Sequence, residues 1–389
     1  MRALTAIDTA DPVAFRHAVA RALDGENPLA LGFRPSDEDR VPDGTAVVIA
    51  TSGSTGVPKR VVLSAAALRA SASATAARVG SGSWLLALAP GYVAGLQVVV
   101  RSVLAGTTPA VLPGRFHAAE FCALAAELSA GGARLSSLVP AQLGDLLDLA
   151  GHDPAAATAL RTFDALLIGG QALAPALRAR AADLGVRIVR TYGSSETAGG
   201  CVYDGVPLDG VRVAQVDGEL RIGGPTLADG YLGDPAQTAD RFLRAEGARW
   251  YRTGDLGEIS DDGVVAVTGR ADNVIVSGGV NVSLDRVERV VRTVPGLGSA
   301  LVVPVPDERW GQGSAIVVPG GIDTGTEDPA EASLAVVRLL DAVRDAVAAE
   351  IGPAARPSLL LPVRTLPLLA SGKPDRRALS ALAARTHAL

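Results

Sequence analysis

Residues 51–60 form a short polar stretch, TSGSTGVPKR, between two apolar runs. Ala46–Ala50 precedes it and Val61–Leu63 follows it, so it is expected on a loop at the end of a strand. Glycines let backbone N–H groups approach an anion, hydroxyl groups add donors, and Lys59 supplies a positive charge. These residues suit a phosphate-binding loop. A serine- and glycine-rich surface turn is the alternative, and the stretch alone does not decide, because the Walker A spacing is not met.

Four further stretches carry groups that suit nucleotide chemistry. They are residues 191–197 (TYGSSET), 251–257 (YRTGDLG), 269–272 (GRAD) with 277–279 (SGG), and 371–374 (SGKP). The first offers an aromatic ring, hydroxyl groups and a carboxylate, the second places Asp255 on a tight turn, and the last places Lys373 on a glycine turn. Each has a structural alternative, since Asp-Gly turns are common and a lone lysine is usually solvated.

Together and in this order, the five stretches resemble the adenylate-forming superfamily of acyl-CoA synthetases, firefly luciferases and peptide-synthetase adenylation domains. The resemblance runs from about Thr45 to the C-terminus, and the region before Thr45 is shorter than in most members. Within the superfamily, TYGSSETAGGCVYDG, VPLDGV and the short length look most like the 2-succinylbenzoate–CoA ligases of menaquinone biosynthesis.

The resemblance implies a reaction in two halves. A carboxylate attacks the α-phosphorus of ATP to give an acyl-adenylate and pyrophosphate, and the thiol of CoA then displaces AMP. The first half needs no general base, because the nucleophile is already an anion; it needs charge neutralisation and alignment. The chain fits this, since its four histidines lie outside the five stretches.

The resemblance also assigns roles residue by residue. The β- and γ-phosphates are expected at Thr51, Ser52, Gly53, Ser54, Thr55, Gly56 and Lys59, and the α-phosphate at Ser195. Adenine and ribose are expected at Gly169, Gly170, Gln171, Tyr192, Asp255 and Arg270. Glu196 is expected to hold Mg²⁺, which prefers oxygen ligands, and Lys373 to be catalytic by bridging the α-phosphate and the attacking carboxylate. Asp272 is expected at a hinge, with Gly278 and Gly279 beside CoA.

The acid is expected at Tyr92, Arg101, Gly193 and Ser194. Many relatives carry an aromatic–histidine pair where this chain has Gly91 and Tyr92. Arg101 lies inside the apolar segment GLQVVVRSVLAG, where an arginine often snorkels or forms a structural ion pair. Succinylbenzoate ligases carry an arginine at this place that binds the aromatic carboxylate, and a guanidinium suits a bidentate carboxylate contact. The resemblance therefore favours a ligand role for Arg101.

The composition excludes several classes of protein. Apolar residues make up 48% and charged residues 20%, which is typical of a globular rather than a disordered chain. A net charge of −5 without a strongly basic run argues against nucleic acid binding. The N-terminus lacks the apolar core of a signal peptide, and the uncharged run Trp84–Val100 is too short to span a membrane. Two distant cysteines suit a reduced, cytoplasmic compartment.

Strand-like apolar runs alternate with helical patterns, which predicts an α/β protein with layered, parallel sheets. Strands are expected at 46–50, 84–89, 162–168 and 186–191, and helices at 64–78, 94–105 and 174–184. Residues 211–269, with their Asp-Gly turns, predict a small β-rich subdomain. The residues after this subdomain predict a small α+β domain, and the resemblance implies that this domain is mobile. The domains are therefore placed at 1–271 and 272–389.

The leading hypothesis is a 2-succinylbenzoate–CoA ligase, with an aromatic dicarboxylate, ATP and CoA as partners. Another aryl- or acyl-CoA ligase, or an adenylation enzyme that loads a separate carrier protein, stays open. A non-enzymatic binding protein is disfavoured because Glu196, Asp255 and Lys373 are all present. A homodimer is one possible assembly.

Overall fold

The structure is a computed structural model that describes residues 1–51, 58–129, 131–245, 247–322, 325–326, 328–369 and 374–387. The chain divides into two compact units. The first comprises Met1–Thr253 and Ile259–Val265, and the second comprises Gly254–Glu258 and Ala266–Leu389. Alternating helices and strands confirm the predicted α/β class. The predicted domain boundary between residues 271 and 272 stays a prediction.

The first unit contains a mixed sheet with the strand order β16-β6-β5-β3-β2. Its strands are β2 (Thr5–Ala6), β3 (Leu29–Leu31), β5 (Thr45–Thr51), β6 (Lys59–Ser64) and β16 (Gly230–Tyr231). β2, β3 and β5 run parallel, whereas β5, β6 and β16 are antiparallel neighbours. The polar stretch 51–60 therefore connects two paired strands as a hairpin. Separately, β1 (Arg2–Ala3) pairs with β4 (Arg40–Val41).

A larger sheet of the same unit has the strand order β13-β12-β11-β10-β9-β7-β8. Its strands are β7 (Gly82–Leu86), β8 (Ala110–Val111), β9 (Ala133–Leu138), β10 (Ala165–Ile168), β11 (Ile188–Ser194), β12 (Gly199–Tyr203) and β13 (Val206–Pro207). The strands from β8 to β11 in this order are parallel, and β12 and β13 add antiparallel pairs. The parallel strands confirm the layered α/β expectation and bring their carboxyl ends to one edge.

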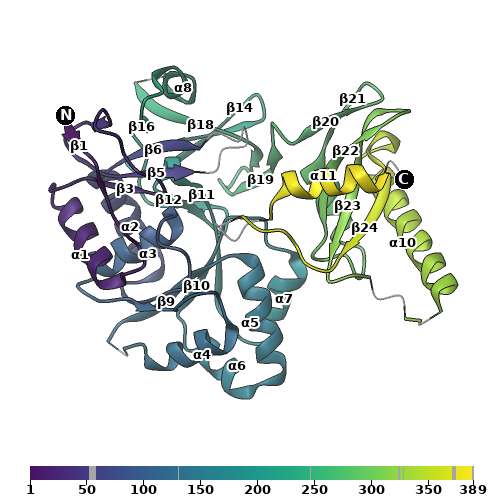
Figure 1. The fold of residues 1–389 in the computed structure, drawn as a ribbon, viewed down its shortest axis with the longest axis horizontal. Coiled ribbons are helices and arrows are strands. Elements are labelled where there is room, and N and C mark those ends of the chain that lie inside the picture. The colour runs from purple at the N-terminus through teal and green to yellow at the C-terminus, as the bar shows by residue number, and fades with distance from the viewer. Residues whose placement is uncertain are drawn as a thin grey trace. The chain divides into compact units, whose positions relative to one another are not determined.

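Helices cover both faces of the larger sheet, and α2 and α3 lie between the two sheets (Figure 1). The helices of the first unit are α1 (Pro12–Leu23), α2 (Ala65–Val79), α3 (Val93–Leu104), α4 (Ala118–Glu127), α5 (Pro140–His152), α6 (Pro154–Arg161), α7 (Pro175–Asp183) and α8 (Pro235–Arg241). Side chains of β10 alternate: Ala165 and Leu167 face the core with α2 and α3, whereas Leu166 and Ile168 face α4, α5 and α6.

Local sequence explains where α2 begins and ends. The Ser64 hydroxyl accepts a hydrogen bond from the Ala67 amide at 3.2 Å, which satisfies a donor of the first turn. Gly80 follows the helix with φ 94°, a conformation that glycine adopts without strain. The N-terminal cap at Ser64 and the glycine at position 80 therefore set the length of α2, which packs along α3.

The β-rich part predicted for residues 211–269 is a sheet with the order β14-β15-β18-β17, to which β19 adds on β18. Its strands are β14 (Arg212–Val216), β15 (Glu219–Gly223), β17 (Phe242–Ala245), β18 (Ala248–Ile259) and β19 (Val265–Arg270). Arg252 of β18 pairs with Glu219 at 3.3 Å and with Asp240 of α8 at 3.1 Å, which holds the helix against the sheet. α8 was not predicted.

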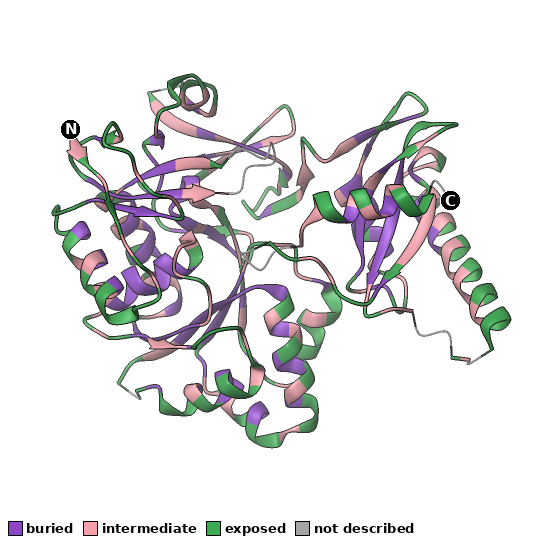
Figure 2. Cartoon of the chain, viewed as in Figure 1, coloured by how far each residue is buried: buried purple, intermediate pink, exposed green. Residues whose placement is uncertain are grey.

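The second unit is an α+β layer. Its sheet has the order β21-β20-β23-β22, with β24 added on β23. The elements are β20 (Val274–Ser277), β21 (Val280–Ser283), α9 (Leu284–Val291), β22 (Leu301–Asp307), β23 (Gly311–Pro319), α10 (Pro329–Glu350), β24 (Leu359–Val363) and α11 (Arg376–His387). α9 and α10 pack on one face and α11 on the other, and the buried residues follow the strands between them (Figure 2). The β20–β21 hairpin was not predicted.

A buried carboxylate ties the elements of the second unit together. Glu288 of α9 pairs with Arg292 at 2.7 Å and with Arg376, the first residue of α11, also at 2.7 Å. The Val302 amide of β22 donates to the same carboxylate at 3.0 Å. Because every contact is an N–H donor to a buried anion, the charge of Glu288 is well compensated.

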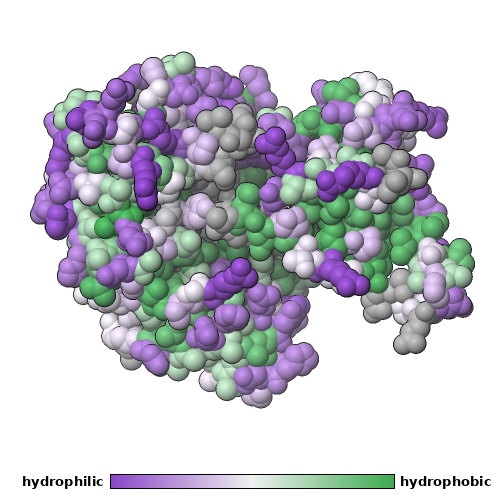
Figure 3. Space-filling view, in the orientation of Figure 1, coloured by the Kyte–Doolittle hydropathy of each residue, from purple (hydrophilic) through white to green (hydrophobic). Residues whose placement is uncertain are grey.

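Within the described residues, no helix is long and apolar enough to cross a membrane. Hydrophilic and hydrophobic residues are interspersed on the face of the protein shown in Figure 3.

Candidate active site

The β5–β6 hairpin fixes both ends of the predicted phosphate loop. Thr51 and Lys59 are directly paired, and the Thr51 hydroxyl donates to the Lys59 carbonyl oxygen at 3.4 Å. Ser52, Gly53, Ser54, Thr55 and Gly56, which were also predicted to bind phosphate, lie outside the described residues. Paired strands thus hold the two ends of a loop whose sequence suits phosphate.

The residues predicted to surround adenine lie at the carboxyl ends of two neighbouring parallel strands. Gly169, Gly170 and Gln171 follow β10, and Tyr192 lies on β11, half-buried. A Cβ on Gly169 would lie 2.3 Å from the Thr191 hydroxyl oxygen, so the strands can approach this closely only with glycine there. The structure therefore brings these residues to one edge of the sheet, where ligands of parallel sheets bind.

A tight turn after β11 positions Ser194, Ser195 and Glu196. Ser195–Thr197 form a short 3₁₀-helix, and the Thr197 hydroxyl accepts a hydrogen bond from the Ser194 amide at 2.9 Å and donates to the Gly199 carbonyl at 2.7 Å. Gly193, before the turn, leaves no room for a side chain, because a Cβ would lie 2.1 Å from the Gly199 carbonyl oxygen. The turn buries Glu196 to 8% exposure.

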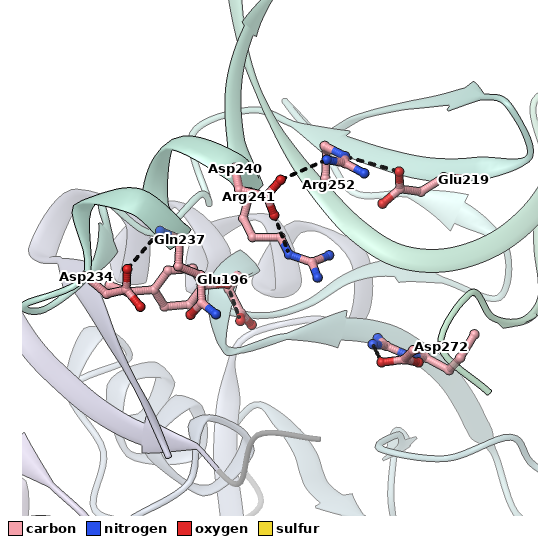
Figure 4. A network of polar contacts seen from close by, with 10 residues as sticks. Glu196, Glu219, Asp234, Gln237, Asp240, Arg241, Arg252 and Asp272 are labelled. Atoms are coloured by element: carbon pink, nitrogen blue, oxygen red, sulfur yellow. Dashed lines mark hydrogen bonds and ion pairs between the residues drawn. The ribbon is translucent and has the colours of Figure 1, made fainter. Parts of the chain in front are cut away.

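Tyr231 connects the two charged groups predicted to meet the phosphates and the metal. Its hydroxyl donates at 3.0 Å to Oε1 of Glu196, the carboxylate labelled in Figure 4, and Nζ of Lys59 lies 5.5 Å from the centre of its ring. Burial and the neighbouring Glu196 charge both raise the pKa of Tyr231, so its hydroxyl keeps its proton and donates. Sequence reasoning missed Tyr231. An aromatic residue directly after the Asp229-Gly230 turn was the available signal.

The carboxylate of Glu196 suits a magnesium ion better than a fully protein-made metal site. No cluster of three or more His, Cys, Asp or Glu side chains that could hold a metal occurs among the described residues. Mg²⁺ is commonly held by one or two carboxylates together with water and substrate phosphates. A single carboxylate, bonded to the same tyrosine whose ring Lys59 faces, fits that pattern, and Glu196 is the residue that would hold the ion.

Arg101 lies on α3 as a buried cation, 7% exposed. Its Nη2 donates to the Tyr203 hydroxyl at 3.4 Å, its guanidinium lies 5.0 Å from the Trp84 ring centre, and its Nε finds no hydrogen-bond partner in the described part of the chain. Among the described residues, no carboxylate pairs with it, and burial lowers its pKa. A cavity of about 160 Å³ adjoins Arg101 and Trp84. This arrangement leaves the cation free to take an anionic ligand.

Buried polar groups lead from the Glu196 turn toward Arg101. Gln97, one helical turn before Arg101, donates to the Ala198 carbonyl at 2.7 Å, while its Oε1 and the Ser71 hydroxyl have no partner among the described residues. A Cβ on Gly199 would lie 3.2 Å from Gln97, so the turn and the helix touch. Tyr92, the residue that precedes α3, is half-buried about two and a half helical turns before Arg101. Uncompensated buried polar atoms mark a place where a polar ligand could bind.

In the second unit, Arg270 joins two predicted site residues. Its Nη1 donates to Asp255 at 3.0 Å, and its Nε and Nη2 donate to the two oxygens of Asp272 at 2.9 Å each. The hydrogen bonds with Asp272 and the charges of both aspartates raise the pKa of Arg270. The prediction that Asp255 lies on a tight turn is wrong: it lies within β18, and Gly254 takes its positive φ of 72° inside that strand rather than in a turn between strands.

The two glycines predicted beside CoA differ in their surroundings. Both lie in the β20–β21 turn with positive φ, Gly278 at 56° and Gly279 at 81°. A Cβ on Gly278 would lie 2.2 Å from the Trp310 ring, whereas no atom of the residues that the structure describes lies within 4 Å of a Cβ on Gly279. Gly278 is thus required by local packing, and Gly279 leaves open space above the backbone.

Lys373, the predicted catalytic residue, lies outside the described residues, but the chain on both sides of it is held. Leu368 and Pro374 form an antiparallel bridge, and the Asp375 amide donates to the Pro367 carbonyl at 2.8 Å. Arg376 follows and contacts Glu288. The residues on the two sides of Lys373 are therefore hydrogen-bonded to each other.

Comparison with known proteins adds to this geometry. Residues 4–232 match the AMP-binding enzyme family, and residues 286–373 match the AMP-binding enzyme C-terminal domain. The chain is 42% identical over 379 residues to a probable 2-succinylbenzoate–CoA ligase of Mycobacterium tuberculosis H37Rv, covering 93% of each protein. It is 31% identical to a 2-succinylbenzoate–CoA ligase of Bacillus cereus, covering 72% of this chain and 61% of that protein.

Solved structures show the same fold. A variant of MenE from E. coli with bound OSB-AMS matches with a TM-score of 0.68 and 25% identity, over 91% of this chain and 72% of that chain. The o-succinylbenzoate CoA synthetase MenE of Bacillus subtilis, in complex with the acyl-adenylate OSB-AMP, matches with a TM-score of 0.70 and 21% identity. This match covers 97% of this chain and 82% of that chain. The second likeness bears on the fold alone.

Proposed function

Because the chain belongs to the AMP-binding enzyme family, we propose that it is an AMP-forming ligase that joins 2-succinylbenzoate to CoA, a step of menaquinone biosynthesis. The reaction consumes ATP and yields 2-succinylbenzoyl-CoA, AMP and pyrophosphate. Relatives with this name, matched along most of the chain, support the choice of acid. The observation that carries the proposal is Arg101, a buried cation to which the described residues give no carboxylate. We place the reaction in the cytoplasm, where ATP and CoA are available.

Arg101 suits an acid with two carboxylates. One carboxylate would bind the guanidinium at the end of the buried polar groups, and the other would lie near the Glu196 turn, where the α-phosphate is expected. A guanidinium offers two parallel N–H donors that match a carboxylate. A monocarboxylic acid would leave the buried charge unpaired, which is costly, so the same residue would provide selectivity.

In the first half-reaction, a carboxylate oxygen attacks the α-phosphorus, and the bond to the pyrophosphate oxygen breaks. Lys59 and the hairpin loop would bind the departing β- and γ-phosphates, and Ser195 the α-phosphate. Tyr192 would stack on adenine beside Gly169, Gly170 and Gln171. Mg²⁺ at Glu196 would neutralise phosphate charge. Each contribution is positioning or electrostatic, which is the stabilisation that a transition state with growing charge requires.

In the second half-reaction, the CoA sulfur attacks the acyl carbon, and AMP leaves with the bonding electron pair. Lys373 would stabilise the first transition state and would have to withdraw before the thiol arrives. We propose that the domain of residues 272–389 reorients about Asp272 between the halves, a domain-closure switch. Gly279 would then meet the pantetheine arm, and Asp255 with Arg270 would hold the ribose.

A pyrophosphate-release assay over a panel of acids, with and without CoA, tests the proposal. We expect 2-succinylbenzoate to react far faster than benzoate, coumarate or fatty acids, and CoA to be needed for thioester but not for pyrophosphate. Faster turnover of any monocarboxylic acid would assign the enzyme to another branch of the family. Thioester formation on a carrier protein in preference to CoA would identify a loading enzyme instead.

Replacing Gly279 with leucine is expected to slow thioester formation from supplied acyl-adenylate by at least about tenfold, or about 1.4 kcal/mol. The side chain would fill the open space above the backbone, where the pantetheine arm is proposed to pass. Adenylate formation, followed as pyrophosphate release without CoA, should stay near the wild-type rate.

Gly296→Leu is the matched control, because Gly296 also has positive φ, 83°, and open space around its Cβ position. Both variants incur the strain of a left-handed residue, about 1–2 kcal/mol. If Gly296→Leu slows the CoA step as much as Gly279→Leu does, strain rather than obstruction is responsible.

A further inference from the structure

Tyr231 is held firmly in place by strand pairing and burial. It lies on β16 opposite Val61 of β6, and its amide donates to the Thr238 hydroxyl at 2.9 Å. Its side chain is 6% exposed, and its ring packs on Phe242 with a centroid distance of 5.7 Å. A side chain fixed at its backbone and at its ring can fix the groups that touch it.

Two charged groups of the candidate site touch this one side chain. The hydroxyl donates to Oε1 of Glu196, while Nζ of Lys59 lies over the ring at 5.5 Å. The hydrogen bond engages one oxygen of the carboxylate. Oε2 accepts no hydrogen bond from the described residues and stays available to a ligand. The cation–π contact limits the positions that the long Lys59 side chain can take.

A buried carboxylate that holds a metal usually depends on its own hydrogen-bond partner. Such a partner fixes the orientation of the carboxylate, and its loss typically costs 10- to 100-fold in metal affinity or activity. Glu196 has one such partner among the described residues, the Tyr231 hydroxyl. The rotamers of Glu196 would otherwise be limited only by packing.

We propose that Tyr231 is a positioning residue that aims the Glu196 carboxylate at the Mg²⁺ of the nucleotide and holds Lys59 at the base of the phosphate loop. The inference rests on the proposed function, because Glu196 and Lys59 take their roles from it. It predicts that the two contacts have separate effects. Loss of the Tyr231 hydroxyl should change the Mg²⁺ dependence of ATP binding, and loss of the ring should weaken binding of the phosphates.

Calorimetric titration of ATP into the protein, without acid or CoA and at a series of Mg²⁺ concentrations, tests this. Tyr231→Phe, which keeps the ring, should raise the Mg²⁺ concentration for half-maximal ATP binding by on the order of tenfold. It should leave the affinity for ATP without Mg²⁺ unchanged. Tyr231→Leu, which removes the ring as well, should also weaken ATP binding without Mg²⁺.

Two further variants separate the inference from its alternatives. Tyr203→Phe removes another buried hydroxyl, bonded to Thr75 at 2.9 Å and to Arg101 at 3.4 Å, and should leave the Mg²⁺ dependence of ATP binding unchanged, because acid is absent from this titration. Glu196→Gln alone should raise the Mg²⁺ requirement. The double variant Glu196→Gln/Tyr231→Phe should have the same Mg²⁺ requirement as Glu196→Gln, because Tyr231 acts through Glu196.

The outcomes are distinct. If Glu196→Gln alters Mg²⁺ dependence and Tyr231→Phe does not, the inference is wrong and the proposed function stands. If Glu196→Gln itself has no effect, the metal role of Glu196 is wrong and the inference is overturned with it. If Tyr203→Phe raises the Mg²⁺ requirement as Tyr231→Phe does, the effect is a general loss of stability and the positioning role is refuted.

Discussion

Replacing Lys373 with alanine is expected to slow acyl-adenylate formation by on the order of 10²-fold or more, the scale for losing one preorganised contact to a transition state. The ammonium would stabilise the negative charge that builds up on the α-phosphate and the attacking carboxylate. The same variant should convert supplied acyl-adenylate and CoA to thioester at nearly the wild-type rate. Pyrophosphate release and thioester formation, measured separately, give the two rates.

Arg377→Ala is a suitable control for this prediction. Arg377 is a neighbouring cation near the start of α11, and in the described residues no carboxylate forms an ion pair with it. Loss of its charge should leave both half-reactions near normal. Equal impairment of both halves by Lys373→Ala would contradict a lysine that acts in adenylation alone and, with it, the proposed reorientation of the domain.

The second large effect is expected at Arg101. Arg101→Ala should weaken binding of 2-succinylbenzoate by about 2–5 kcal/mol, the range for removing a partner from a buried charge pair. That is a rise of roughly 30- to 4,000-fold in the acid's dissociation constant, while ATP binding should stay the same. Arg101→Lys should be intermediate, because it keeps the charge and loses the paired N–H donors.

The stability of the Arg101 variant separates a ligand role from a structural role. Burial disfavours the charge of Arg101, and no carboxylate among the described residues compensates it. Alanine would lose the contacts with Trp84 and Tyr203 but also remove an uncompensated buried charge, so these opposing effects should change the free energy of unfolding little. The control Arg78→Ala removes a half-buried arginine of α2 that donates to the Pro207 carbonyl at 2.9 Å, and should leave acid binding unchanged. Wild-type acid binding by Arg101→Ala would refute the ligand role.

The sequence predicts those parts of the site that depend on local pattern. The apolar run after Pro90 predicts the helix that became α3, and the placement of Arg101 inside it follows from helical period alone. The glycines at 169 and 193 lie where the structure leaves no room for a Cβ. Local residue types were enough in these cases, because a strand end or a helix face is determined by its immediate neighbours.

Contacts that depend on distant pairing were not predictable. Tyr231 meets Lys59 and Glu196 because β16 pairs with β6, which lies about 170 residues earlier, and no local pattern encodes that register. Asp255 was misplaced for a similar reason: Gly254 suggested a turn, whereas β18 continues through this glycine, which adopts φ 72° within the strand. Tertiary pairing overrode the local turn preference.

The buried carboxylate of Glu288 has a consequence for how the second unit opens. α9 and α11 lie on opposite faces of the sheet, yet Glu288 joins them through Arg376, and Val302 joins them to β22. If α11 detached alone, Glu288 would keep Arg292 but lose Arg376, one of the two cations that compensate this buried anion. The start of α11 should therefore fray little. Amide hydrogens of α9, β22 and the first turn of α11 should exchange with solvent as one cooperative group.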